Sequence, residues 1–132
     1  MAARSNWMRW VGIVLSVVPS LLMLFSGVMK LTHNPGVVEA FAGKFGYRGE
    51  STLTVIGLLE VGCVVVYAIP RTMVLGAILM TGYLGGAVAT HVRIGDPSFV
   101  MPFLLGVFAW GGLYLRDARI RALLPLTPPN AD

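Results

Sequence analysis

The chain has 132 residues, enough for one domain, and 56% of them are apolar while 12% are charged. Soluble domains have about 25% charged residues, so this chain cannot cover its surface with polar side chains. We therefore expect lipid to cover it, and this composition excludes a soluble globular protein.

The formal charge of +4 comes from basic residues near the ends of apolar runs, not from a cluster of the kind that binds nucleic acid. We expect no nucleic-acid partner. Cys63 is the only cysteine, so no intrachain disulfide can form, and no Cys/His pair has the spacing of a metal site. We expect no bound metal.

The first predicted span covers residues 10–29, about 20 apolar residues and long enough to cross the hydrocarbon core. It is too long for the apolar part of a signal peptide, and no Ala-x-Ala site follows, so we expect it to be retained. At 100° per residue, one face is small and weakly polar and ends in a cation; we interpret it as a helix contact. Its members are Gly12, Ser16, Pro19, Met23, Ser26 and Lys30.

Residues 31–51 form the longest connection. Asn34-Pro35 resembles the N-cap and first residue of a helix, and Phe41 and Phe45 fall on its apolar side. We predict a short amphipathic helix that lies at the membrane interface or covers the bundle. An ordered linker without a binding role fits the sequence equally well.

The second predicted span, residues 53–69, contains Glu60. A charged acid in the middle of a membrane helix costs about 2.5–3.5 kcal/mol on insertion scales. Glu60 should therefore be protonated, paired or facing a wet cavity. The face that carries it also holds Leu53, Gly57, Cys63, Val64 and Tyr67.

The third predicted span, residues 72–92, gathers small residues and a cation within about 100° of one another. These are Gly82, Gly85, Gly86, Ala89 and Arg93. This face predicts the closest helix contact in the bundle. Tyr83 and Thr90 flank it, and His91 falls on the opposite side, so His91 and Arg93 should not face the same neighbour.

The fourth predicted span, residues 99–115, carries an aromatic stripe that we interpret as core packing rather than a ligand site. Phe99, Phe103, Gly106, Trp110 and Tyr114 form it. Residues 116–132 are expected to be a polar, frayed tail. The predicted fold is thus all-α, a single domain forming a four-helix transmembrane bundle with a short helix between the first two spans.

Basic residues predict that both termini are cytoplasmic. This orientation places six basic residues inside, namely Arg4, Arg9, Arg71, Arg116, Arg119 and Arg121. Four lie outside, namely Lys30, Lys44, Arg48 and Arg93.

Antiparallel spans bring the polar residues of three helices to the outer end of the bundle. A structural interpretation pairs Glu60 with Lys30 or Arg93 and leaves the remaining polar groups at lipid head groups. A functional interpretation is a pocket for a polar-headed lipophile, with Glu60 and His91 as candidate catalytic or proton-exchanging groups. The candidate ligand-binding residues are Lys30, Glu60, Tyr83, Thr90, His91 and Arg93.

Three sequence runs resemble the DoxX-like family of small four-helix membrane proteins. They are Ser26-Gly-Val-Met-Lys30, Gly57-Leu-Leu-Glu60 and Thr81-Gly-Tyr-Leu-Gly-Gly-Ala-Val-Ala-Thr-His91, and Phe45-Gly-Tyr47 also fits. The resemblance implies a bacterial cytoplasmic membrane protein, in some relatives the membrane subunit of an oxidoreductase that oxidises thiosulfate with quinone as acceptor. It maps the family's lysine, acid and histidine onto Lys30, Glu60 and His91. A single cysteine argues against a self-contained thiosulfate oxidase.

Our first hypothesis is a membrane subunit that binds a quinone or lipid, with no intrinsic cofactor and with electrons supplied by a redox partner or a bound quinone. A non-catalytic scaffold, acting through its small-residue faces, is the alternative. A small-solute transporter is weaker, because four helices enclose little space unless the protein forms homo-oligomers. Membrane lipids are expected partners in each case.

Overall fold

The computed structural model describes residues 2–124, which form six α-helices with two short irregular turns. Four long helices make the bundle: α1 (Ala2–Leu31), α3 (Glu50–Ala68), α4 (Met73–Arg93) and α5 (Val100–Arg116). The short helix α2 (Pro35–Glu39) and the π-helical turn η1 (Ala40–Lys44) lie between α1 and α3. A 3₁₀ turn, η2 (Pro97–Phe99), precedes α5, and α6 (Ala118–Leu123) follows it.

The described chain holds four segments long and apolar enough to cross a membrane, namely Asn6–Leu31, Glu50–Ala68, Met73–Arg93 and Pro97–Arg116. The predicted all-α transmembrane bundle is therefore confirmed, as is the short helix after the first span. Two bounds differ from expectation. Helix α1 begins eight residues earlier than predicted, and α6 forms where a frayed tail was predicted. The part of that tail from residue 125 onward lies outside the described residues.

Local sequence explains where the connections turn. The side chain of Asn34 caps α2 by accepting a hydrogen bond from the Gly36 amide (3.1 Å), and Pro35 occupies the first helical position. Gly46 ends the turn that follows, with a φ of 75° that suits glycine. Asp117 caps α6 by accepting from the Arg119 amide (2.9 Å), which gives the chain a last helical turn.

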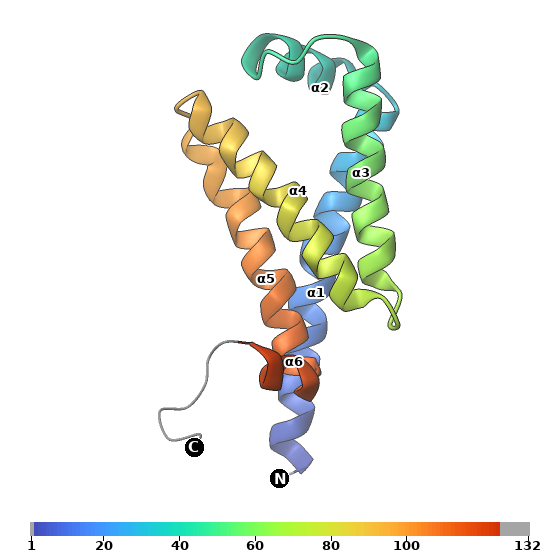
Figure 1. The fold of residues 1–132 in the computed structure, drawn as a ribbon, viewed down its shortest axis with the longest axis vertical. Helices are drawn as coiled ribbons and strands as arrows, with labels where there is room; N and C mark the ends of the chain where they lie inside the picture. The colour runs from blue at the N-terminus through green and yellow to red at the C-terminus, as the bar shows by residue number, and fades with distance from the viewer. Residues whose placement is uncertain (1, 125–132) are drawn as a thin grey trace.

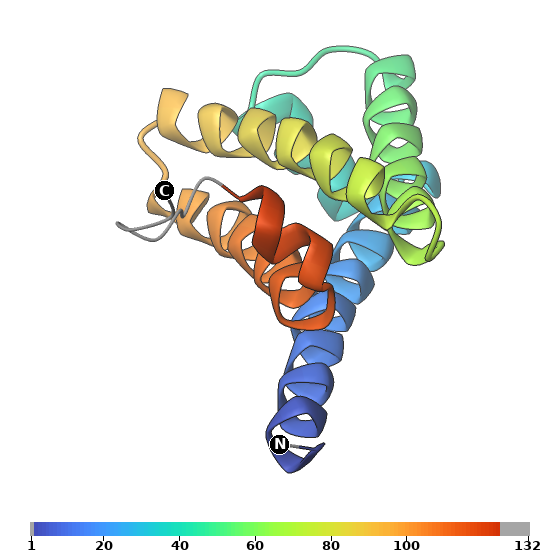
Figure 2. The same cartoon turned by 60° about the horizontal axis from the view of Figure 1, so that its bottom comes forward.

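The four long helices pack in a ring, in which α1 and α4 each contact both α3 and α5. In Figure 1, α4 and α5 lean away from α1 and α3 toward the α2 end of the molecule, so the bundle spreads there. Figure 2 shows α6 folding back beside α5 near the opposite end. The core sits low in the bundle, around Met23, Met80 and Leu113, which are almost fully buried.

The helix faces predicted from the sequence are the buried ones. All six residues predicted to share the face of Glu60 are the buried residues of α3. On α1, five of the six residues of the predicted stripe are buried, and Ser26 is partly buried. Small and weakly polar residues thus mark the inward side of α1, and the face of Glu60 marks that of α3, because lipid can cover apolar side chains as well as protein can.

A buried polar network joins three helices at the α6 end. The Tyr67 hydroxyl donates to the carbonyl of Ala109 (2.8 Å) and lies within 2.8 Å of the Ser16 hydroxyl. Arg116 also donates to the Ser16 hydroxyl (2.8 Å). Because each buried polar group has a partner, this network ties α1, α3 and α5 together without an unsatisfied donor.

Candidate functional site

A pocket of about 610 Å³ lies where the bundle spreads. Its walls come from all four long helices, and its cover comes from η1 and the following loop. This volume is in the range of small-molecule sites. Five of the six candidate ligand-binding residues line it, namely Lys30, Glu60, Tyr83, Thr90 and His91.

The pocket carries a buried ion pair. Lys30 is 6% exposed and Glu60 is 3% exposed, and the Lys30 ammonium lies 2.5 Å from Glu60 Oε2. The same ammonium donates to the Ser26 hydroxyl (2.6 Å), which donates to Glu60 Oε2 (3.3 Å). Of the two cations that the sequence offered for Glu60, the structure selects Lys30, and Arg93 donates to the Phe45 carbonyl instead.

The rest of the pocket wall is mainly apolar and aromatic. Side chains of Met23, Ile56, Leu59, Leu84, Met101 and Leu105 line it between the helices. Phe41 and Tyr47 stack with ring centroids 5.4 Å apart, and the Lys30 ammonium lies 5.6 Å from the Phe41 ring. An apolar chamber with a few converging polar groups at one end is typical of a site for an amphiphilic molecule.

Residues 40–47, which we call the lid, fasten to the C-terminal end of α4. The hydroxyls of Tyr47 and Thr90 are 2.9 Å apart, and Arg93 donates to the Phe45 carbonyl (2.5 Å). The Phe45 ring meets His91 edge-on at 5.1 Å. The lid covers the pocket with its aromatic side chains Phe41, Phe45 and Tyr47, as the covering role predicted for this connection requires.

His91 and Arg93 contact the same neighbour, Phe45, so the prediction that they face different neighbours is wrong. The Phe45 ring packs against His91 while the Phe45 carbonyl accepts from Arg93, so one lid residue meets both side chains. Arg93 does not line the pocket, unlike the other candidate residues. His91 Nδ1 is 2.8 Å from the Ala87 carbonyl, an arrangement in which Nδ1 carries the proton, and Nε2 lies 4.0 Å from Asp96 Oδ2.

An ion pair between Lys44 and Asp96 (2.7 Å) also holds the lid. The hydrogen bond from Lys44 is the main reason that the pKa of Asp96 falls from 3.8 to about 2. A lowered pKa in the folded protein means that the pairing stabilises the closed lid above pH about 4 and is lost as the pH falls toward about 2. Because the Lys44 side chain is half-exposed, salt should weaken the Lys44–Asp96 ion pair.

We expect Asp96→Asn to loosen the lid at neutral pH. Amide hydrogen exchange of Phe45 and Tyr47, which donate to the carbonyls of Ala40 and Phe41, should become faster. In an NMR titration, wild-type lid resonances should shift between pH about 4 and about 2, while those of the variant stay constant over that interval. Identical titrations for the two proteins would contradict this assignment.

The predicted packing face on α4 is wrong. A Cβ atom at Gly82, Gly85 or Gly86 would meet no other atom within 4 Å. The close approach between α3 and α4 is instead at Gly76, where a Cβ would overlap the backbone of Tyr67. Helices α3 and α4 touch at their turn and diverge, so only the glycine near the turn is in contact.

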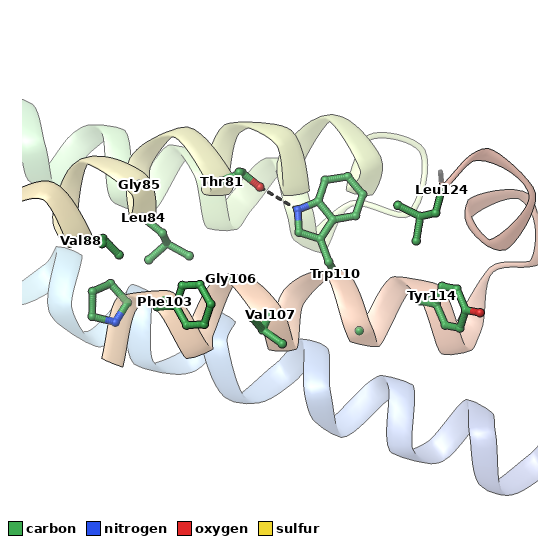
Figure 3. Close-up of a pocket in the computed structure, with 12 residues that line it drawn as sticks. Thr81, Leu84, Gly85, Val88, Phe103, Gly106, Val107, Trp110, Tyr114 and Leu124 are labelled. Atoms are coloured by element: carbon green, nitrogen blue, oxygen red, sulfur yellow. Dashed lines mark hydrogen bonds between the residues drawn. The ribbon is translucent and has the colours of Figure 1, made fainter. Parts of the chain in front are cut away.

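The aromatic stripe of α5 is only partly in the core, because Trp110 packs against the core cluster whereas Phe103 is 58% exposed. Phe103, Gly106, Trp110 and Tyr114 line a second, apolar groove between α4, α5 and the end of α6 (Figure 3). Its volume is about 530 Å³. The Trp110 indole crosses this groove and donates to the Thr81 hydroxyl (2.7 Å). Lipid can cover these side chains in place of protein, which is why a stripe of this kind need not be buried.

Sequence reasoning missed several residues that shape the site. Ser26 was assigned to a contact stripe, although it lies one turn before Lys30 on the same face. Tyr47 was expected only as part of a connection, and it reaches Thr90 through the fold. Among the residues that the structure describes, no cluster of three His, Cys, Asp or Glu could hold a metal ion.

No curated protein and no solved structure matches this chain. A family model described as the DoxX-like family matches residues 14–112, which include α3, α4, the lid and most of α1 and α5. The match spans the three runs that suggested this resemblance, and it contains every pocket-lining residue. The chain is a multi-pass membrane protein, and it belongs to the DoxX-like family.

Proposed function

We propose that the protein is a quinone-binding membrane subunit of a redox-linked complex. The observation that carries this proposal is the Lys30–Glu60 ion pair, buried at the wall of a largely apolar pocket inside a membrane-spanning bundle. Ionisable residues at this depth are costly and usually mark a functional site. The proposal also places the protein in the bacterial cytoplasmic membrane, with both termini in the cytoplasm. The distribution of basic residues supports this orientation.

The hydrogen-bonding capacity of the pair supports a carbonyl-bearing head group. An ammonium has three N–H donors, and Lys30 uses two of them on Glu60 and Ser26. The third can donate to a quinone carbonyl oxygen. A phospholipid head group offers phosphate oxygens instead, and the carboxylate of Glu60 beside Lys30 disfavours such an anion.

Reduction of a quinone to a quinol takes up two electrons and two protons. Glu60 and His91 both line the pocket, and the Glu60 carboxylate and Nε2 of His91 can each take up a proton from the aqueous side and pass it to the reduced head group, while a partner protein supplies the electrons. The aromatic lid residues cover the ring, and the apolar walls hold its substituents.

The test measures how a long-tailed benzoquinone binds to the purified protein in lipid nanodiscs. Quenching of the protein's tryptophan fluorescence reports the binding. Wild type should bind saturably, and Lys30→Met/Glu60→Gln should lose at least about tenfold in affinity, since a charge-assisted hydrogen bond contributes about 1.5–3 kcal/mol. The purified wild-type protein should also retain a bound quinone, which native mass spectrometry detects and lipid extraction releases.

Thr81→Ala is the matched control, because Thr81 lines the other groove and bonds Trp110. It should bind quinone as wild type does. Equal affinities for wild type and the Lys30→Met/Glu60→Gln variant would reject the proposal and leave the ion pair with a purely structural role.

A further inference from the structure

The α2 end of the quinone pocket is covered. Phe41, Phe45 and Tyr47 line the pocket from the lid, and three polar contacts hold the lid to α4 or to the loop after it. A ligand that enters from this end must break those contacts first. The covered end therefore disfavours a water-soluble ligand that comes and goes through it.

The side of the pocket between α3 and α4 is open instead. Near the turn, Gly76 packs so closely on Tyr67 that no Cβ would fit, whereas two and three turns later Gly82 and Gly86 have no atom near the place of a Cβ. Both glycines line the pocket and are exposed. On α3, Leu59 also lines the pocket and is 57% exposed.

Neither helix geometry nor packing requires glycine at these two positions. Glycine in a helix interior costs about 0.5–1 kcal/mol relative to alanine, and here no neighbour approaches closely enough to exclude a side chain. The positions lie four residues apart, on one edge of α4 beside the pocket. The absence of side chains at Gly82 and Gly86 leaves the space beside the pocket on this edge of α4 unobstructed.

We propose that Gly82 and Gly86 form one edge of a lateral portal between α3 and α4. A long-chain lipophile enters the pocket from the bilayer through this portal. Its head group reaches Lys30 and Glu60, and its tail stays in the portal and the surrounding lipid. The inference rests on the proposed function and narrows its substrate class to quinones with long apolar tails.

The opposite flank of the pocket is the competing route. Met101 of α5 lines the pocket and is 56% exposed, so that side also reaches the surface. Its wall carries full-length side chains at Met101 and Leu105, which narrow the passage. The glycine edge of α4 lacks such side chains.

The experiment compares binding of a long-tailed and a tail-less benzoquinone to wild type and to Gly82→Leu/Gly86→Leu in nanodiscs. The double variant should lose about tenfold or more in affinity for the tailed quinone, because leucine occupies the path of the tail. Its affinity for the tail-less quinone should fall by much less, because that ligand has no tail to lie between the helices. Since neither position contacts a neighbour, its thermal midpoint should stay close to that of wild type.

Gly85→Leu is the matched control. Gly85 lies on the same helix, is equally exposed and has no atom near its Cβ position, but it lines the other groove. It should bind both quinones as wild type does.

Equal losses in Gly85→Leu, or equal losses of the two quinones in the double variant, would overturn the portal. So would a loss in Met101→Trp with none in the glycine variants. Failure of wild type to bind either quinone would overturn the proposed function itself. Normal tailed-quinone binding by the glycine variant would overturn only the portal.

Discussion

Lys30→Met should lower the free energy of unfolding by about 3–5 kcal/mol, the cost of leaving a buried charge without its partner. Glu60 is 3% exposed and would keep only the Ser26 hydroxyl as a hydrogen-bond donor from the present cluster. Equilibrium unfolding of the purified protein in detergent micelles measures this loss, and the thermal midpoint should fall with it.

Lys30→Met/Glu60→Gln tests whether the ion pair serves stability or function. Removing both charges should restore most of the lost stability, because a buried ion pair can often be replaced by neutral side chains without net cost. Quinone binding should remain lost in both variants. If the double variant is as unstable as Lys30→Met alone, the main role of the ion pair is to stabilise the contact between α1 and α3.

Gly76→Ala should destabilise the protein by about 1–3 kcal/mol or more, because its new methyl group would overlap the backbone of Tyr67 and push α4 away from α3. Backbone atoms cannot move aside as the end of a flexible side chain can. The overlap lies beside the Ser16–Tyr67–Arg116 network, so those hydrogen bonds should weaken as well. The measurement is the free energy of unfolding, together with exchange of the Gly76 amide, which donates to Thr72.

Gly85→Ala is its control on the same helix. No atom lies near its Cβ position, so the change should be neutral or should stabilise the helix by up to about 1 kcal/mol. A larger loss for Gly85→Ala than for Gly76→Ala would show that α4 packs through its exposed glycines, as the sequence alone suggested.

Sequence by itself determined the four spans and the inward faces of α1 and α3. A membrane helix must satisfy its own backbone, so length and apolarity mark each span. Helical periodicity then placed Glu60 with the five other buried residues of α3, and antiparallel order placed Lys30 and His91 at the same end. The capping residues Asn34 and Pro35 also marked the start of α2 from the sequence.

Only the tertiary structure decided which groups meet. A helical wheel gives directions around one axis and says nothing of how far the next helix lies. That is why Lys30 rather than Arg93 pairs with Glu60, and why Gly76 touches α3 while Gly82 and Gly86 face open space. The lid, held by Asp96 and Arg93 from α4 and its loop, depends on contacts about 50 residues apart in the sequence, which no local pattern records.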